Sequence, residues 1–220
     1  MRLAAALGLG LILVASGCAS ADQSRHPLTY VALGASDAVG VGATNPDSGG
    51  WVPRFGARLG SNVRVVNLGV SGSTLAQALQ EQLQPAIDAR PNVITVWLAV
   101  NDFNARIPLE DYSKNLDTLL SQLDPLHAQV LVGNVPDLGR VAAYRGADAT
   151  ALDAEVGRWN EAIARIVAQH GATLVDLFAR WKEVTQHPEY LSQDGFHPSD
   201  EGYARLADVF AEAASARPSS

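Results

Sequence analysis

The sequence predicts a single α/β domain in which helices cover both faces of a five-stranded parallel sheet. Short apolar runs rich in β-branched residues alternate with longer segments whose apolar residues recur every three or four positions, which is the pattern of repeated βα units. No linker or internal repeat interrupts this alternation between residues 28 and 215. The composition, with 47% hydrophobic and 18% charged residues, is typical of one globular domain with a full core.

Five short apolar runs are predicted to form the strands. They are rich in Val, Ile and Leu and are of the kind that is buried on both faces, as in a parallel sheet. The runs lie at residues 28–33, 63–67, 93–98, 130–134 and 173–177.

The segments between these runs are predicted to be helices. The clearest pattern places apolar residues three and four positions apart on one helix face, at Leu152, Val156, Trp159, Ile163, Ile166 and Val167. Further helices are predicted at residues 51–59, 74–87, 112–123 and 200–214. The domain is expected to span residues 28–215, and residues 216–220 are expected to be a loose tail.

The first 17 residues are predicted to be a signal peptide. Arg2 gives a positive start, and the apolar stretch at residues 3–14 is too short to span a bilayer, which needs about 20 residues. The protein is therefore expected to be exported.

Cys18 is the only cysteine, so the chain cannot form an internal disulfide. The sequence that ends at this residue, VASGC, resembles a bacterial lipobox, in which the cysteine is lipidated and becomes the mature N-terminus. Residues 18–27 would then be a short tether that holds the domain at the membrane of the cell envelope. The alternative is cleavage after the small-x-small sequence at residues 19–21, which would remove Cys18 and give a secreted soluble protein.

Charge and motif content exclude several classes of partner. A formal net charge of -7, a pI near 5.1 and the lack of a Lys/Arg cluster argue against nucleic-acid binding. The histidines and acidic residues lack paired metal-ligand spacing, and the glycines form neither a dinucleotide fingerprint nor a phosphate loop. We therefore expect no metal and no cofactor, and we expect a monomer.

Two short motifs near opposite ends of the domain contain the residues of a hydrolytic site. Ser36 lies in GASDAVG directly after the first apolar run, and His197 lies in DGFHP just before the last predicted helix. A serine hydroxyl is a weak nucleophile near neutral pH, so it needs a base and a group that orients the base. We predict that Ser36 is the nucleophile, His197 the base and Asp194 the orienting carboxylate.

The predicted topology brings further polar groups to the same edge of the sheet. Sites in open parallel sheets form at the carboxyl ends of the strands, and Ser36, Gly69 and Asn101 follow the first three apolar runs. The transition state of ester hydrolysis needs hydrogen-bond donors aimed at the developing oxyanion. The backbone N–H groups of Ser36 and Gly69 and the side-chain amide of Asn101 are the predicted donors.

Each of these residues also has a purely structural interpretation. Ser36 can cap a helix, Asp194 can be a turn residue, and His197 can be a surface histidine. Gly69 can simply permit a tight turn, and Asn101 can end a strand. Their order along one chain favours the catalytic interpretation, because the structural one needs five separate coincidences.

In these motifs the chain resembles the SGNH hydrolases, also called GDSL esterases and lipases, and the resemblance covers nearly the whole domain. The family's first motif, Gly-Asp-Ser with a following Gly, is matched by Gly34, Ser36 and Gly40. The second motif is matched by NLGVSG, the third by AVND and the fourth, Asp-x-x-His, by DGFH. The resemblance implies a three-layer α/β/α, flavodoxin-like fold and cofactor-free ester hydrolysis through a serine triad.

Two positions depart from the family's pattern. Ala35 replaces the Asp of the first motif, and Ala99 replaces the Gly of the third. Since neither position supplies a triad side chain or an oxyanion donor in the family, the resemblance implies altered loop geometry rather than lost chemistry. Asp37, directly after the predicted nucleophile, is a candidate to replace part of the missing carboxylate contact.

The resemblance leaves the substrate open, because the family includes lysophospholipases, thioesterases, carboxylesterases and carbohydrate acetylesterases. We expect a small or lipid-like carboxylic ester or thioester. A carbohydrate O-acetylesterase is the alternative, and a non-catalytic binding lipoprotein of the cell envelope is the alternative from another class. Aromatic residues in or near the predicted loops are candidate pocket walls, namely Trp51, Phe103, Tyr144 and Phe196. The loop at residues 136–150 can shape the acyl pocket or be plain surface.

Overall fold

The computed structural model describes residues 27–216, except for the side chains of residues 184 and 185. The predicted signal peptide, Cys18 and the tether up to residue 26 lie outside the described residues, as do residues 217–220 of the predicted tail. Within residues 27–216, no helix combines the length and the apolar composition needed to cross a membrane.

The central element is one parallel sheet with the strand order β2-β1-β3-β4-β5. All five predicted strands form, so the prediction of a five-stranded parallel sheet is confirmed. The strands are β1 (Leu28–Gly34), β2 (Val63–Asn67), β3 (Val93–Trp97), β4 (Gln129–Gly133) and β5 (Thr173–Val175).

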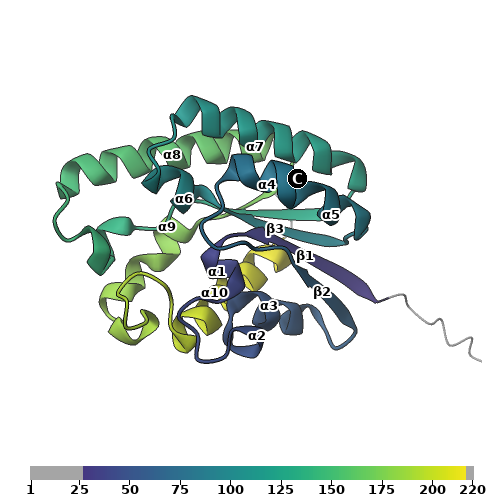
Figure 1. Ribbon diagram of the computed structural model, residues 1–220, viewed down its shortest axis with the longest axis horizontal. Coiled ribbons are helices and arrows are strands. Elements are labelled where there is room, and N and C mark those ends of the chain that lie inside the picture. The colour runs from purple at the N-terminus through teal and green to yellow at the C-terminus, as the bar shows by residue number, and fades with distance from the viewer. Residues whose placement is uncertain (1–26, 217–220) are drawn as a thin grey trace, which may run out of the picture.

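Helices form a layer on each face of this sheet (Figure 1). On one face, α3 (Trp51–Leu59) packs beside α10 (Asp200–Ser215); on the other, α7 (Leu109–Leu123) packs beside α8 (Ala149–Gln169) and α4 (Leu75–Glu81). The three-layer α/β/α architecture is therefore confirmed. Shorter helices are α1 (Ser36–Val39), α2 (Pro46–Gly49), α5 (Leu83–Asp88), α6 (Ala99–Asn104) and α9 (Leu177–Arg180).

The strand order creates a crevice at the carboxyl end of β1. The chain passes from β1 outward to β2 and then returns to β3 on the other side of β1. The connections that follow β1 and β3 therefore leave the sheet toward opposite faces, and ligands of open parallel sheets bind between such connections. The short helix α1 begins two residues after β1, and α6 begins two residues after β3.

The helix predicted at residues 74–87 is in fact two helices. α4 begins after Thr74, whose hydroxyl accepts from the N–H of Gln77 (3.4 Å), while the Gln77 side chain accepts from the N–H of Thr74 (2.9 Å). The helix is interrupted at Gln82, because Pro85 has no N–H to donate to the carbonyl of Glu81. The prediction of one continuous helix is therefore wrong.

The edge strand β2 departs from the predicted burial. Its residues are exposed or half-buried, and Val65 is 38% exposed. β2 lies at the edge of the sheet and has only β1 as a neighbour, whereas β3 is buried along its whole length. The prediction of burial on both faces is wrong for β2 and holds for the central strands.

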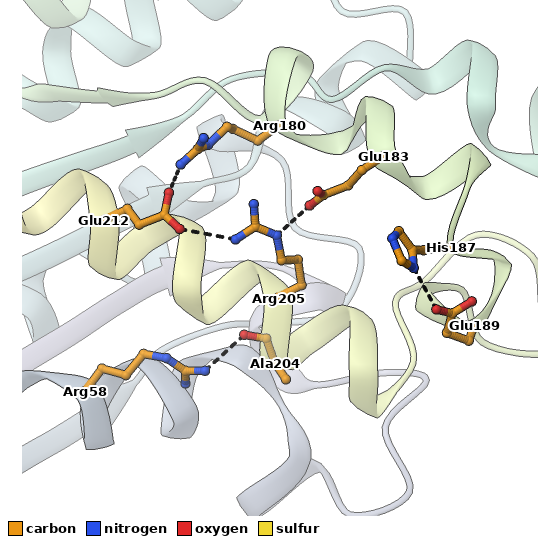
Figure 2. A network of polar contacts seen from close by, with 8 residues as sticks. All are labelled: Arg58, Arg180, Glu183, His187, Glu189, Ala204, Arg205 and Glu212. Carbon is orange, nitrogen blue, oxygen red and sulfur yellow. Dashed lines mark hydrogen bonds and ion pairs between the residues drawn. The ribbon is translucent and has the colours of Figure 1, made fainter.

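A network of ion pairs fixes α10 against the segment that precedes the DGFH motif (Figure 2). Arg205 of α10 pairs with Glu183, and Glu212 of the same helix pairs with both Arg205 and Arg180. On the other side of the helix, Arg58 of α3 donates to a backbone carbonyl of α10 (3.1 Å). Single exposed ion pairs contribute little to stability, but together these contacts set the position of α10, which begins directly after the DGFH turn.

Candidate active site

Three predicted residues from opposite ends of the domain form one chain of hydrogen bonds. Ser36 is the first residue of α1 and lies at the carboxyl end of β1. Its Oγ is 3.0 Å from His197 Nε2, and His197 Nδ1 is 2.6 Å from Asp194 Oδ2. The structure therefore brings Ser36, His197 and Asp194 together in the order that the sequence predicts.

The carboxylate of Asp194 is held by its own turn. Its Oδ1 accepts from the backbone N–H groups of Phe196 (2.8 Å) and His197 (2.9 Å) and from Ser192 Oγ (2.9 Å). Burial acts to raise the pKa of Asp194, but the hydrogen bonds from His197, the two backbone N–H groups and Ser192 outweigh it and hold that pKa well below its usual value. Asp194 is therefore ionised and fixed in orientation near neutral pH.

The loop after Ser36 closes directly onto the turn that carries His197. Gly42 has a φ of +96°, and a Cβ at this position would lie 2.5 Å from the carbonyl oxygen of Pro198 and 3.1 Å from His197 Cβ. Only glycine fits both this backbone conformation and this close approach. On the far side, Ser199 caps α10 by accepting from the N–H of Gly202 (3.2 Å). His197 is thus held between the start of α10 and the loop at residues 35–42, here called the nucleophile loop after the predicted role of Ser36.

Gly69, a predicted oxyanion donor, packs against the nucleophile loop. A Cβ at Gly69 would lie 2.7 Å from Ala38 Cβ and 3.2 Å from the carbonyl oxygen of Ala35, so a larger residue would displace α1. The Gly69 N–H donates to Asn67 Oδ1 (3.1 Å), and Asn67 Nδ2 donates to the carbonyl of Ala38 (2.6 Å). A substrate oxygen at this N–H would therefore share or replace the contact with Asn67.

Asn101, the predicted side-chain donor, lies in α6 directly after β3. One N–H of its amide donates to the carbonyl of Ser73 (2.9 Å), which fixes the amide plane and leaves the second N–H of Nδ2 for another acceptor. Asn101 shares the lining of a very small cavity with Ala35 and Asp37. The amide is therefore adjacent to the nucleophile loop, as predicted.

The two departures from the family's motifs are both buried methyl groups. Ala35 is 4% exposed and Ala99 is fully buried, so neither side chain offers a polar contact to the site. Asp37 does not stand in for the missing carboxylate through any side-chain hydrogen bond to another described residue.

Asp37 instead lines a small apolar cavity together with Phe196 and Pro198, the two neighbours of His197. The cavity has a volume of about 30 Å³. Burial raises the pKa of Asp37 to about 6, against the lowering effects of the nearby His197 and of its own backbone N–H, while Asp194 adds to the increase. The other lining residues are Trp97, Val100, Pro136, Leu138, Val141, Leu177, Trp181 and Leu206.

A second, larger depression is partly lined by Tyr144. This groove has a volume of about 530 Å³ and combines aromatic rings with amide, guanidinium and carboxylate groups. The ring centroid of Tyr144 is 6.4 Å from that of Phe196, and the Phe196 ring packs edge-on against His197. The lining residues are Phe103, Asn104, Arg106, Ile107, Pro108, Leu109, Tyr144, Glu155 and Trp159.

The predicted pocket walls divide between site and core. Phe103 and Tyr144 line the groove, and Phe196 lines the small cavity. The prediction that Trp51 lines a pocket is wrong, because its side chain is fully buried and stacks on Phe210 at 4.3 Å between ring centroids. It belongs to the packing of α3 on α10. The loop at residues 136–150 supplies walls to both depressions and is therefore not plain surface.

Sequence reasoning missed two buried side chains that support the site. Asp102 Oδ2 accepts from the N–H of Leu75 (2.8 Å) at the start of α4, and burial raises the pKa of Asp102 to about 6 despite this bond. Gln82 is 1% exposed and contacts the backbone of Gly34. Asp102 belongs to the third motif and offered a signal, whereas Gln82 lies in no motif.

A model of the GDSL-like lipase/acylhydrolase family matches residues 32–205. The chain belongs to this family. It is a serine hydrolase that acts on ester bonds, which agrees with the arrangement of Ser36, His197 and Asp194 at the carboxyl edge of the sheet. Among residues 27–216, no group of three or more His, Cys, Asp and Glu side chains is arranged to hold a metal ion.

Individual relatives of this GDSL-family hydrolase are distant in sequence and close in fold. An acetylxylan esterase from Geobacillus stearothermophilus is 23% identical over 160 residues, which cover 67% of this chain and 70% of that protein. A GDSL-like lipase from Parabacteroides merdae superposes with a TM-score of 0.72 at 18% identity, covering 85% of this chain and 95% of that chain. An alpha/beta hydrolase enzyme from the metagenome of Lake Arreo gives 0.69 at 22% identity, covering 84% and 94%.

Replacing Asp37 with Asn should stabilise the protein at neutral and basic pH. The pKa of Asp37 in the folded state lies above the ordinary value of 3.8, so the ionised carboxylate lowers the free energy of unfolding. This loss of stability grows as the pH rises from about 4 through 6. We expect Asp37→Asn to raise the free energy of unfolding by about 2 kcal/mol at pH 8 and by almost nothing at pH 4. Urea unfolding at several pH values measures this difference.

The matched control is Asp153→Asn, which changes an exposed aspartate of α8. It should leave the free energy of unfolding nearly unchanged across the same pH range. A gain from Asp37→Asn that is equal at pH 4 and pH 8 would contradict the assignment of a buried, penalised carboxyl group.

Proposed function

We propose that Ser36, His197 and Asp194 are a catalytic triad that hydrolyses esters through a covalent acyl-enzyme. The observation that carries this proposal is the continuous hydrogen-bond chain from Ser36 Oγ through the imidazole to a fixed carboxylate. The Nδ1 atom of His197 faces Asp194, so the proton of the neutral imidazole resides on Nδ1 and Nε2 is free to accept the serine proton.

The first half of the reaction forms the acyl-enzyme. As Ser36 Oγ attacks the ester carbonyl carbon, His197 Nε2 removes the hydroxyl proton, and Asp194 stabilises the resulting imidazolium. The carbonyl oxygen becomes an oxyanion within reach of the N–H groups of Ser36 and Gly69 and the free N–H of Asn101 Nδ2. His197 then donates its proton to the leaving alcohol as the C–O bond breaks.

The second half repeats these steps with water. His197 removes a proton from water as it attacks the acyl carbon, the same donors hold the second oxyanion, and the proton is returned to Ser36 Oγ as the acid departs. No group outside the protein and substrate is needed to balance this sequence.

Replacing Ser36 with Ala should abolish covalent labelling by a fluorophosphonate. The probe reacts only with an activated serine, so we expect the labelling rate of Ser36→Ala to fall by about 10³-fold or more. In-gel fluorescence of the folded proteins measures the rate. The control is Ser121→Ala, which removes an exposed hydroxyl from α7 and should label like the wild type. A folded wild-type protein that does not label would favour the non-catalytic binding lipoprotein instead.

The small cavity and the groove favour a short acyl group on a large polar alcohol. The small cavity, with about 30 Å³ of space, admits about two water-sized groups, which suits an acetyl group better than a fatty acyl chain. The groove offers aromatic faces beside Asn104, Arg106 and Glu155, a lining that fits a ring with many hydroxyl groups. The relation to an acetylxylan esterase supports the same interpretation. We therefore propose carbohydrate acetyl esters as the substrate class.

Replacing Tyr144 with Ala should impair a carbohydrate ester more than a simple one. The variant removes one aromatic wall of the groove, so kcat/KM for an acetylated xylo-oligosaccharide should fall about tenfold relative to that for 4-nitrophenyl acetate. For the wild type, kcat/KM should also fall as the acyl chain of 4-nitrophenyl esters lengthens from acetate to octanoate. Equal losses on both substrates in Tyr144→Ala, or a rising preference for octanoate, would argue for a lipid-like ester.

We also propose, from the sequence of residues 1–21 alone, that the mature protein is anchored at the cell envelope through lipidated Cys18. Protein purified from membranes with detergent should then begin at Cys18, and its intact mass should include the added acyl chains. Substituting Cys18 with Ala should release the protein from the membrane fraction. An unmodified N-terminus at Asp22 would instead indicate ordinary secretion.

A further inference from the structure

Gln82 is a polar side chain buried in the interior of the domain. It is 1% exposed and lies where α4 ends and α5 begins, at the interruption caused by Pro85. A buried amide is costly unless its hydrogen bonds are satisfied. The hydrogen-bond partners of the Gln82 amide therefore show why a polar side chain is stable at this buried position.

The amide of Gln82 completes the hydrogen bonding at the end of β1. The last register pair of β1 and β2 is Ala32 with Asn67, but the segment after β2 stays beside β1, because the N–H of Val70 donates to the carbonyl of Gly34 (3.2 Å). The N–H of Gly34 would be left without a partner at this point. Gln82 Oε1 accepts from the Gly34 N–H (2.9 Å), and Gln82 Nε2 donates to the Gly34 carbonyl (3.0 Å). The side chain thus supplies the acceptor for the Gly34 N–H and a second donor, beside the Val70 N–H, for the Gly34 carbonyl.

The same amide faces the segment that holds Asn101. Gln82 Nε2 lies 3.4 Å from Ser73 Oγ, and the Ser73 carbonyl accepts the hydrogen bond from Asn101 Nδ2 (2.9 Å). The Ser73 N–H donates to the carbonyl of Val70 (3.0 Å), while the Val70 N–H donates to the Gly34 carbonyl (3.2 Å). Gln82 therefore joins the end of β1 to the segment that carries Gly69 and positions Asn101.

We propose that Gln82 is a positioning residue. It holds the end of β1, and with it the nucleophile loop, in place relative to two predicted oxyanion donors, the N–H of Gly69 and the side-chain amide of Asn101. Gly34 is two residues before Ser36, and between them Ala35 provides only a methyl group where the family's motif has a carboxylate. The side chain of Gln82 accepts from the N–H of Gly34, the last residue of β1, and shares the Gly34 carbonyl with the N–H of Val70. This inference rests on the proposed ester hydrolysis, because its effect is on the geometry of that reaction.

The first test compares Gln82→Met with the matched variant Gln84→Met. Met has nearly the same shape as Gln and keeps neither hydrogen bond to Gly34, whereas Gln84 is exposed two positions further along and bonds only to Asp88 among the contacts described. We expect Gln82→Met to lower the fluorophosphonate labelling rate and kcat for 4-nitrophenyl acetate by about 100-fold, the effect of displacing a reacting group by about 1 Å. KM should change less than about threefold, and Gln84→Met should behave like the wild type.

The second test uses Gln82→Glu and stays informative if Gln82→Met does not fold. A protonated Glu accepts from the Gly34 N–H and donates to the Gly34 carbonyl, whereas an ionised Glu places a negative charge against that carbonyl. Labelling of Gln82→Glu, relative to the wild type, should therefore rise about tenfold per pH unit as the pH falls, until the carboxyl is protonated. Because the ratio to the wild type is used, the titration of groups present in both proteins cancels. These groups are Asp37, Glu81, Asp102, Asp194 and His197.

The outcomes separate this inference from the proposed function. Failure of the folded wild type to label would remove the proposed function itself. A wild type that labels, together with a Gln82→Met protein that labels at the same rate, would overturn the positioning role. A Gln82→Glu protein with a constant ratio to the wild type between pH 5 and pH 8 would also overturn it, since a purely structural residue lowers the melting temperature without changing the rate of the folded molecules.

Discussion

The hydrogen bond between Ser36 and His197 joins residues 161 positions apart. Several elements at the carboxyl edge of the sheet hold one or the other of these two residues in place. One end is fixed by the short helix α1, which begins as soon as β1 finishes. The other is fixed by the DGFH turn, whose carboxylate is held by its own backbone, and by α10, which the Arg205 network ties to the preceding segment. A nucleophile and base must be held within about 0.5 Å of the productive geometry, so both ends need rigid supports.

Electrostatics divides the aspartates of the site into two kinds. Asp194 is partly exposed but receives hydrogen bonds from several donors, so its pKa is lowered and it stays charged. Asp37 and Asp102 lie among apolar groups with few donors, and the pKa of each is raised to about 6. Asp194 thus supplies a negative charge beside His197 near neutral pH, whereas Asp37 and Asp102 are protonated more easily. The larger number of donors and the lesser burial at Asp194 together account for the difference.

Short sequence patterns correctly predicted the features that depend on interactions between residues close together in the chain. The strands follow from apolar runs, and Asp194 and His197 follow from a spacing of three, because one short turn can satisfy both their backbone and their side-chain contacts. Trp51 was misplaced because an aromatic residue beside a loop has the same signature whether it faces a pocket or a core. Gln82 could not be found at all, since its partner Gly34 lies 48 positions away and the need for it arises only beyond the last register pair of β1 and β2.

The shapes of the small cavity and of the groove also bear on the order of events in the proposed reaction. In that proposal the acyl group occupies the small cavity that Asp37 lines, and the alcohol occupies the larger groove that Tyr144 lines. A large alcohol would then leave through the groove while a small acyl group stays on Ser36, and water would reach the acyl carbon from the vacated groove. A long apolar chain in the small cavity would lie beside Asp37, and its burial would add to the cost of keeping that carboxyl group charged. The proposed arrangement thus favours acetyl esters over fatty esters.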